Sequence, residues 1–180
     1  MQALLQASFG DCKRPATSLC NVRSSYEPVS APQFFVYDSP DPTSTQPSRI
    51  VSADEDFQLT VNNPAESAVW FVKTDKCLFT DEVSKCDCLL FNDQKAFLVE
   101  IKTSSPGGRS NKRQRAVVQL AATIETLRAA GIDLTTYEAR AIICFKRNDT
   151  SPIRASLNTQ RALFLDKYKI SLEEGNIIDF

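Results

Sequence analysis

The stretch KCDCLLFNDQKAFLVEIK, residues 85–102, decides the fold predicted for this chain. Two apolar runs, 86–91 and 96–102, flank four polar residues at 92–95, and this pattern predicts a β-hairpin. Neither run alternates cleanly between apolar and polar residues, so both faces of each strand are expected to be covered. The hairpin is therefore predicted to lie inside a sheet with helices packed on it.

Charged residues gather at one end of this hairpin. Asp87 begins the first strand, whereas Glu100 and Lys102 end the second. Side chains two positions apart on a strand point the same way, so Glu100 and Lys102 share a face and Ile101 packs on the opposite one. Because the turn lies at the other end of the hairpin, we expect Asp87, Glu100 and Lys102 to converge on one edge of the sheet.

Two carboxylates this close repel each other, which raises a pKa unless a cation intervenes. A hard divalent cation takes one or two carboxylates together with water and substrate phosphate, so Asp87 and Glu100 are predicted to bind Mg²⁺ or Mn²⁺. The carbonyl group of Ile101 is expected to add a ligand, and Lys102 to orient or activate water or to stabilise developing charge. The alternative is a structural ion pair, because a lone E-x-K is common on exposed strands.

The elements around the hairpin predict an α/β (α+β) sandwich with a central sheet flanked by helices. Residues 110–131 carry apolar side chains at i, i+3, i+4 and i+7 and end at Gly131, which predicts an amphipathic helix. A weaker helical segment covers 155–170. Aromatic and β-branched content predicts further strands. They cover residues 33–37, 57–61, 68–73 and 137–146.

The composition fits one globular domain with an appendage. The 180 residues are 42% hydrophobic and 24% charged, with a formal net charge of -1, so no overall positive charge attracts the chain to nucleic acid. Most of the nine prolines lie within residues 1–64. Residues 1–50 are therefore predicted to be a proline-rich N-terminal arm, and residues 51–180 the main domain.

Residue types that are missing restrict the chemistry. The chain contains no histidine, which excludes Ser-His-Asp and Cys-His catalysis, HNH-like nucleases and the common zinc hydrolases. The six cysteines form no CxxC pair, and Cys86 and Cys88 are expected to be small buried hydrophobic residues. No apolar run approaches the ~18 residues of a membrane helix, and the N-terminus does not resemble a signal peptide. We therefore expect a cytoplasmic protein without membrane contact.

The spacing of Asp87, Glu100 and Lys102 (D-x12-E-x-K) resembles that of the PD-(D/E)XK, or restriction-endonuclease-like, nuclease superfamily. The resemblance extends over about residues 60–146 and is strongest to short bacterial members, through VKTDKC, KCDCLLF, AFLVEIK and a helix with QLAAT. It implies an αβββαβ core and Mg²⁺-dependent hydrolysis of phosphodiester bonds by an endonuclease or exonuclease. It further implies a role in defence against phage or mobile DNA.

The resemblance also bears on individual positions. Thr103 stands where the group usually has glycine, and Cys86 where it has proline. The first helix of the superfamily often carries a further glutamate, for which Glu55 and Glu66 are the candidates. A helix glutamine often contacts the site in this superfamily, which makes Gln119 the candidate accessory catalytic residue. An ordinary helix glutamine is the alternative.

Basic residues open the long predicted helix. Arg109, Lys112, Arg113 and Arg115 lie within seven positions and follow the segment TSSPGG, 103–108. Basic residues in the first turns of a helix oppose its macrodipole, and phosphate contact would explain their presence. These four residues are therefore predicted to bind nucleic acid, with a solvated basic turn as the alternative.

Other interpretations remain open. Asp75 either approaches the site from the neighbouring strand or is a plain turn residue. The whole chain would alternatively be a catalytically inactive module on the same fold, or a subunit of a larger complex, that contacts a partner protein through residues 1–50. A homodimer is a further option. The sequence has no aromatic RNA-binding signature, so DNA is preferred to RNA as the substrate.

Overall fold

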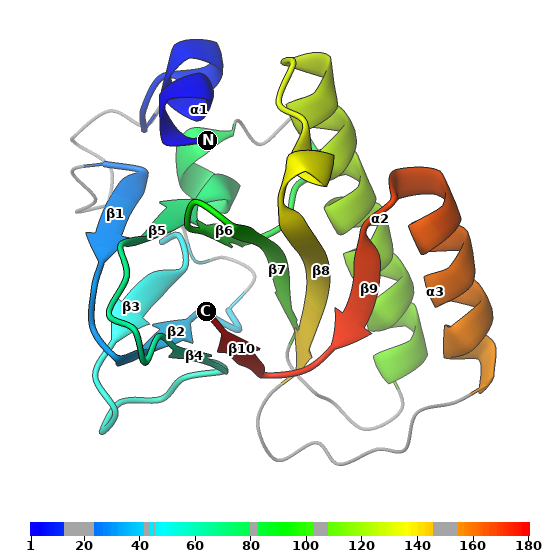
Figure 1. Cartoon of the computed structure of the whole chain (residues 1–180). Helices are drawn as coiled ribbons and strands as arrows, with labels where there is room; N and C mark the ends of the chain where they lie inside the picture. The colour runs from blue at the N-terminus through cyan, green and yellow to red at the C-terminus, as the bar shows by residue number, and fades with distance from the viewer. Residues whose placement is uncertain (13–23, 42–43, 45, 80–82, 103–107, 146–154) are drawn as a thin grey trace.

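Two β-sheets and a layer of helices make up the architecture (Figure 1). The computed structural model describes all residues except 13–23, 42–43, 45, 80–82, 103–107 and 146–154. The larger sheet lies in the middle, with helices on one face and the smaller sheet on the other. This is an α+β arrangement with mixed sheets flanked by helices.

The larger sheet has six strands in the order β1-β5-β6-β7-β8-β9. Its strands are β1 Tyr26–Val29, β5 Val69–Lys73, β6 Cys88–Phe91, β7 Lys95–Lys102, β8 Glu138–Phe145 and β9 Ser171–Glu174. From β1 to β7 neighbouring strands are antiparallel, whereas β7, β8 and β9 are parallel. The change occurs at β7 because a helix, and not a hairpin turn, carries the chain from β7 to β8.

The smaller sheet has four strands in the order β10-β4-β2-β3. Its strands are β2 Gln33–Tyr37, β3 Arg49–Val51, β4 Leu59–Asn62 and β10 Ile177–Asp179. Phe34 and Val36 alternate with more exposed residues along β2, and both are buried between the sheets. Phe97 and Val99 of β7 face them across the same core. The odd-numbered residues of β7 therefore face the small sheet, and the even-numbered ones face the helices.

The helices cover the other face of the large sheet (Figure 1). They are α1 Gln2–Phe9, α2 Arg109–Ala129 and α3 Ala155–Tyr168, with short helical turns η1 Thr74–Leu78 and η2 Leu134–Thr136. The long helix α2 packs on β7 and β8, and α3 packs on β9. A stripe of buried side chains on α2 faces the sheet. Its apolar members are Ala116, Leu120, Ile124 and Leu127.

The end of α2 follows the predicted glycine stop. Gly131 has φ +77°, in the left-handed region that glycine adopts at low cost. Its N–H donates to the carbonyl oxygen of Arg128 (2.9 Å), and the N–H of Ile132 donates to that of Leu127 (2.9 Å). This pair of hydrogen bonds is the Schellman arrangement, and Ile132 and Leu127 are both buried beside it.

Most predicted elements are confirmed, and the short ones were missed. The hairpin, the four further strands and both helices are present, with ends shifted by one or two residues in most cases. The elements without a prediction are α1, β1, β3, β9 and β10. These strands have three or four residues each, which is too short for an alternating pattern to stand out.

The described part of residues 1–50 is built into the layers. Leu5 of α1 is buried with the helix-side core, β1 pairs with β5, and β2 and β3 belong to the small sheet. The predicted boundary at residue 50 remains a prediction, although residues on both sides of it share the same cores. Within the described ranges, no helix combines the length and the apolar character that crossing a membrane requires.

The left-handed conformation of Gly131 predicts a specific loss of stability. Gly131→Ala should lower the free energy of unfolding by about 1 kcal/mol, because an L-residue is strained at this φ. Gly175→Ala is the control, since its φ lies outside that region and no atom lies within 4 Å of the new Cβ. Urea denaturation of the two variants measures the difference. Equal stability of both variants would contradict the assignment of the helix stop.

Candidate active site

The end of the β6–β7 hairpin brings Asp87 next to the end of β7. The N–H of Asp87 donates to the carbonyl oxygen of Val99 (3.0 Å), which extends the ladder between the two strands. The Oδ2 atom of Asp87 accepts the N–H of Ile101 (2.6 Å). The carboxyl group of Asp87 is thus held at the residue between Glu100 and Lys102, as the hairpin geometry predicted.

Glu100 and Lys102 point toward α2 and meet Gln119 there. The Nζ atom of Lys102 donates to Oε1 of Glu100 and to Oε1 of Gln119, the latter at 2.9 Å. Gln119 in turn donates through Nε2 to the carbonyl oxygen of Lys85 (3.0 Å). The structure therefore brings Asp87, Glu100, Lys102 and Gln119 together. Their catalytic roles remain predictions.

One oxygen of Glu100 has no internal partner. The Glu100 side chain is 0% exposed, and its Oε2 atom makes no hydrogen bond to any described residue. A buried carboxylate oxygen without a partner is unfavourable unless a proton or a cation is close to it. Burial is the main cause that raises the pKa of Glu100 to about 8, and the charge of Lys102 only partly opposes it.

The neighbouring groups respond to the same burial. Burial raises the pKa of Asp87 well above its ordinary value, and the charges of Glu100 and Asp38 raise it further. Burial lowers the pKa of Lys102, but the Glu100 carboxylate outweighs burial, so the pKa of Lys102 is raised. The site therefore combines two carboxyl groups that resist ionisation with an amine that keeps its charge.

Asp38 is a member of this electrostatic group that the sequence analysis missed. It follows β2 in the small sheet, and its N–H donates to Oε1 of Gln58 (2.9 Å). Burial raises the pKa of Asp38 to about 6, against the charge of Lys76 and with that of Asp75. Asp38 lies in a proline-rich segment without a motif. Only the pairing of the small sheet brings it toward Asp87.

The start of β6 is held by two loops. The carbonyl oxygen of Asp87 accepts the N–H groups of Thr74 (3.2 Å) and Asp75 (3.3 Å). It also accepts the hydroxyl of Ser48 (3.3 Å), which is fully buried. Asp75 pairs with Lys85 through Oδ1 (3.3 Å). Asp75 thus lies in the η1 turn and also approaches the site, so the two alternatives for this residue are compatible.

Two of the four predicted phosphate-binding residues form ion pairs with Glu174 of β9. Arg113 is 8% exposed and donates through Nε and Nη2 to both carboxylate oxygens of Glu174. Arg109 donates to Oε2 of Glu174 (3.2 Å) and lies over the ring of Phe145 (4.1 Å). Burial alone would raise the pKa of Glu174, but these hydrogen bonds hold it below its ordinary value. Both guanidinium groups thus pair with Glu174, and phosphate binding by Arg109 and Arg113 remains a prediction.

The remaining predicted positions are Arg115, Lys112, Ile101 and Thr103. Arg115 is exposed on α2 and Lys112 is half-buried, so their binding to nucleic acid remains a prediction. Ile101 offers its N–H to Asp87, and its carbonyl ligand role also remains a prediction. Thr103 and most of the segment 103–108 lie outside the described residues.

The two candidate positions for a further glutamate lie in loops. The carboxylate of Glu55 accepts the N–H and the hydroxyl of Ser52 (both 3.0 Å) and pairs with Arg49 (3.6 Å). Glu66 lies in the loop before β5 with φ 50°. Both glutamates are exposed to solvent, in contrast to the buried pair Asp87 and Glu100.

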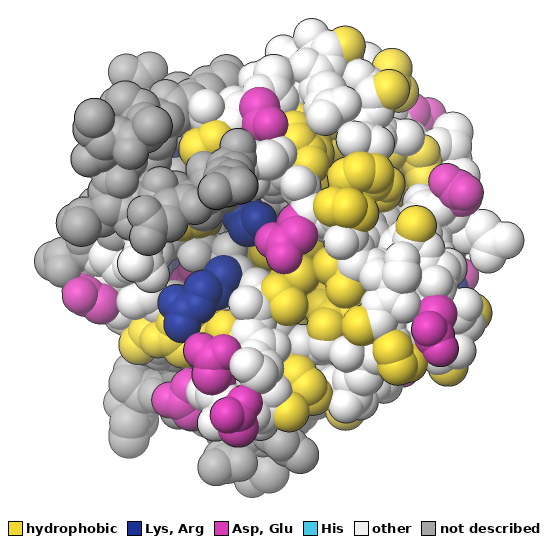
Figure 2. All heavy atoms as spheres, turned by 90° about the vertical axis from the view of Figure 1, so that its left-hand side faces the viewer, with side chains coloured by type: hydrophobic (Ala, Val, Ile, Leu, Met, Phe, Trp, Pro, Cys, Tyr) yellow, Lys and Arg dark blue, Asp and Glu magenta, His cyan; other side chains and the backbone are white. Residues whose placement is uncertain are grey.

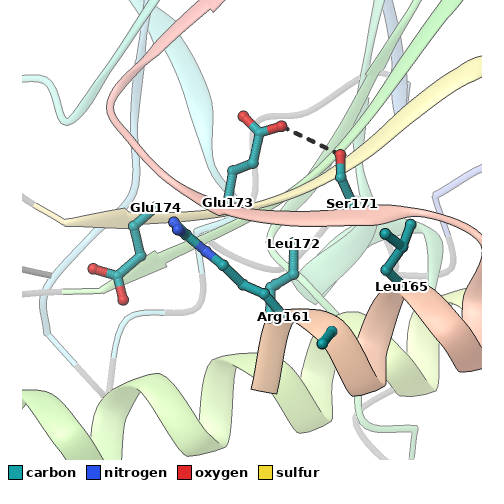
Figure 3. A pocket seen from close by; sticks show the side chains of 7 residues that line it. Arg161, Leu165, Ser171, Leu172, Glu173 and Glu174 are labelled. Carbon is teal, nitrogen blue, oxygen red and sulfur yellow. Dashed lines mark hydrogen bonds between the residues drawn. The ribbon is translucent and has the colours of Figure 1, made fainter. Parts of the chain in front are cut away.

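A hollow between α3 and β9 has a volume of about 460 Å³. Figure 3 shows Ser171 and Glu173 on one side of β9, joined by a hydrogen bond of 3.2 Å, and Arg161 on the other side. Glu174, which also lines this hollow, is the partner of Arg109 and Arg113. The hollow shares no lining residue with the candidate site.

The described part of the chain contains buried cysteines and acidic residues that are possible metal ligands. Cys86 and Cys88 are buried, as predicted, and burial raises the pKa of the Cys86 thiol to about 12. No group of three or more His, Cys, Asp or Glu side chains in this part is arranged to hold a metal ion. Asp87 and Glu100 nevertheless fit Mg²⁺, which commonly binds one or two protein carboxylates, and Oε2 of Glu100 has an open acceptor.

Charges on the face over β1 and β3 are mixed. Figure 2 shows that Lys and Arg side chains there lie directly beside Asp and Glu side chains. The described ion pairs on these strands and their neighbours include Lys73–Glu27 (2.6 Å), between β5 and β1, and Arg49–Glu55 (3.6 Å), which begins at β3. Neutralised pairs attract a phosphate backbone weakly, so these two pairs offer little to nucleic acid.

Comparisons with known protein families, with characterised proteins and with solved structures found no match to this chain.

The raised pKa values predict how stability changes with pH. Between about 4.5 and about 8 the unfolded chain has lost the Glu100 proton, whereas the folded chain retains it. The free energy of unfolding should therefore fall as the pH rises through this window, by a total on the order of a few kcal/mol. Glu100→Gln should remove much of this fall.

Urea denaturation across the same window measures this effect. Asp93→Asn is the matched control, because Asp93 is exposed at the other end of the same hairpin. It should keep the pH dependence of the wild type. If the free energy of unfolding of Glu100→Gln falls with pH as steeply as that of the wild type, the raised pKa of Glu100 is not the cause of the fall.

Proposed function

We propose that this protein is a metal-dependent nuclease that hydrolyses phosphodiester bonds, in which Asp87 and Glu100 bind Mg²⁺ or Mn²⁺. The observation that carries this proposal is the fully buried Oε2 of Glu100, which has no hydrogen-bond partner among the described residues. It lies on a hairpin end that also holds Asp87 and a charged lysine. A buried acidic pair beside a fixed amine is an arrangement suited to divalent cations and phosphate esters.

The order of elements supports a PD-(D/E)XK type of core for this proposal. A helix, three antiparallel strands, a helix and a parallel strand follow one another as α1, β5, β6, β7, α2 and β8. The strands β1 to β4 come between α1 and β5, and three of them, together with β10, form the small sheet. The acidic residues lie on the central hairpin of this succession, as the superfamily pattern requires.

The protein residues would divide the work in a defined way. The bound cation would supply positive charge that polarises the phosphate group. Asp87 is held by the N–H of Ile101, so its carboxyl group needs little reorganisation on binding. Glu100 lies close to Asp87 on the neighbouring strand β7, and its Oε2 atom, which has no hydrogen-bond partner among the described residues, would bind the cation. Burial of both groups limits the access of bulk water to the cation.

Lys102 serves in this scheme as a fixed charge. Since its pKa is raised, the amine keeps its protons at neutral pH and is not a general base. Glu100 and Gln119 hold Nζ in place from two sides. From this position the ammonium group would orient a water molecule or stabilise negative charge on the phosphoryl oxygens.

Substitutions at the hairpin end test the proposal. Asp87→Asn and Glu100→Gln should abolish both cleavage and binding of Mn²⁺. Lys102→Met should keep metal binding and reduce cleavage by on the order of 10²- to 10³-fold, as when one charge-stabilising donor is lost. Calorimetry with Mn²⁺, and cleavage of plasmid, single-stranded DNA and RNA, give the two readouts.

Matched controls lie at the other end of the same hairpin. Asp93→Asn and Lys95→Met should behave as the wild type in both assays. Cleavage of RNA alone would correct the preference for DNA. If the wild type neither binds a divalent cation nor cleaves any of the three substrates, the nuclease proposal is wrong.

A non-catalytic module on the same fold is the second candidate function. The closed chain from Glu100 through Lys102 to Gln119 favours it, since the amine already has two partners. In that case Glu100 and Lys102 form a structural ion pair, and the hydrogen bond from Lys102 to Gln119 joins β7 to α2. Absence of metal binding in the calorimetry would support this second candidate. Defence against phage or mobile DNA rests on the resemblance alone.

A further inference from the structure

A hollow on the solvent side of α2 adjoins the candidate active site. Its volume is about 440 Å³. The residues that line it are Ser84, Asn111, Gln114, Arg115, Val118 and Gln119. Five of them follow the i, i+3, i+4, i+7, i+8 pattern of one helix stripe, and Ser84 comes from the segment before β6.

Gln119 lines the hollow and also contacts Lys102 of the candidate site. Its Oε1 atom accepts the Nζ of Lys102 (2.9 Å), and its Nε2 atom donates to the carbonyl oxygen of Lys85 (3.0 Å). Ser84 precedes Lys85 directly, and Asp87 follows two residues later. A ligand in the hollow would therefore lie one side chain away from Lys102.

The packing of α2 does not explain the composition of this stripe. The helix buries a different stripe, which includes Leu120 and Ile124, against the sheet. Asn111, Gln114 and Arg115 are exposed. Val118 is also 61% exposed. These four lining residues are thus accessible to a ligand.

The lining combines three kinds of recognition chemistry. Asn111 and Gln114 carry exposed amide groups, which donate and accept hydrogen bonds as the edges of nucleobases do. Arg115 brings a guanidinium group, which binds phosphate and stacks on bases. Val118 offers an apolar surface on which the face of a base can rest. This set suits a nucleotide better than a plain anion or an apolar ligand.

We propose that this hollow binds one unpaired nucleotide of a nucleic acid strand, next to the phosphodiester at the active site. The inference rests on the proposed function and adds the substrate class to it. An unpaired nucleotide fits because a paired base is stacked and its edge is already occupied, whereas a single strand can turn a base into a recess. The substrate is therefore a single strand, or a duplex with frayed or flapped ends.

Binding of short labelled oligonucleotides to the full chain tests this proposal. Fluorescence anisotropy in the presence of a chelator prevents cleavage, and the same sequence is offered as single-stranded DNA, single-stranded RNA and blunt duplex. The wild type should bind a single strand more tightly than the duplex. The double variant Asn111→Ala with Arg115→Ala should bind the preferred strand about tenfold more weakly, an expected loss for two polar contacts.

The control removes the same charge elsewhere. Arg140 is half-buried near the start of β8, where it pairs with Glu138, whereas the site lies at the end of β7, to which β8 is parallel. Arg140→Ala should therefore bind all oligonucleotides as the wild type does. Thermal melting verifies that the double variant is folded, since alanine is favourable on an exposed helix face. Equal binding by the double variant and the wild type would overturn the proposal.

Competition separates nucleotide recognition from simple attraction of anions. A nucleoside monophosphate should displace the labelled strand, and inorganic phosphate or a poly-glutamate peptide should not. Equal displacement by poly-glutamate or by phosphate would overturn the proposal, because Arg115 would then act only as a charge. The DNA and RNA arms show which sugar the hollow prefers.

The two proposals fail in different ways. If Mn²⁺ binds as proposed and the double variant keeps full affinity for the strand, the hollow is not the nucleotide site and the metal site stands. If Mn²⁺ does not bind and strand affinity still depends on Asn111 and Arg115, the nuclease proposal fails and the binding hollow stands.

Discussion

The register of the β6–β7 hairpin is the constraint on which the candidate site depends. Cys88 pairs with Val99, and the ladder continues through the N–H of Asp87 to the carbonyl oxygen of Val99. This register directs Glu100 and Lys102 toward α2 and Ile101 toward the small sheet. A slip of one residue would reverse both directions and bury a carboxylate among Phe and Val side chains. The apolar residues on both faces of β7 hold the register against such a slip.

The burial that holds the register also creates the electrostatic character of the site. Burial of Glu100 on β7 beneath α2 raises the pKa of its carboxyl group, and the charges of Asp38 and Asp75 raise it further. The charge of Lys102 lowers the pKa of Glu100 in part, and Gln119 holds the amine in place by a hydrogen bond. The same helix presents Gln119 to the site and its neighbouring residues to solvent. One helix thus contributes both to the charged centre and to the hollow beside it.

Local patterns and distant pairing contributed differently to what could be foreseen. The hairpin, the long helix and the group of Asp87, Glu100 and Lys102 follow from alternation, periodicity and the geometry of one turn, which are local properties. Asp38 and Ser48 were missed because the small sheet brings them to the site from a proline-rich segment. The pairing of Arg109 and Arg113 with Glu174 was missed because Glu174 belongs to β9, a strand too short to show a pattern.

The sequence by itself determined the elements and the residues that share a strand end. It did so because side-chain period and turn length depend on neighbours in the chain. Tertiary structure alone decided which charges are neutralised and which remain open. Arg113 is satisfied by Glu174, whereas Oε2 of Glu100 has no partner among the described residues. The physical reason is that burial and ion pairing depend on contacts between segments far apart in sequence, and their strength changes with the water that packing excludes.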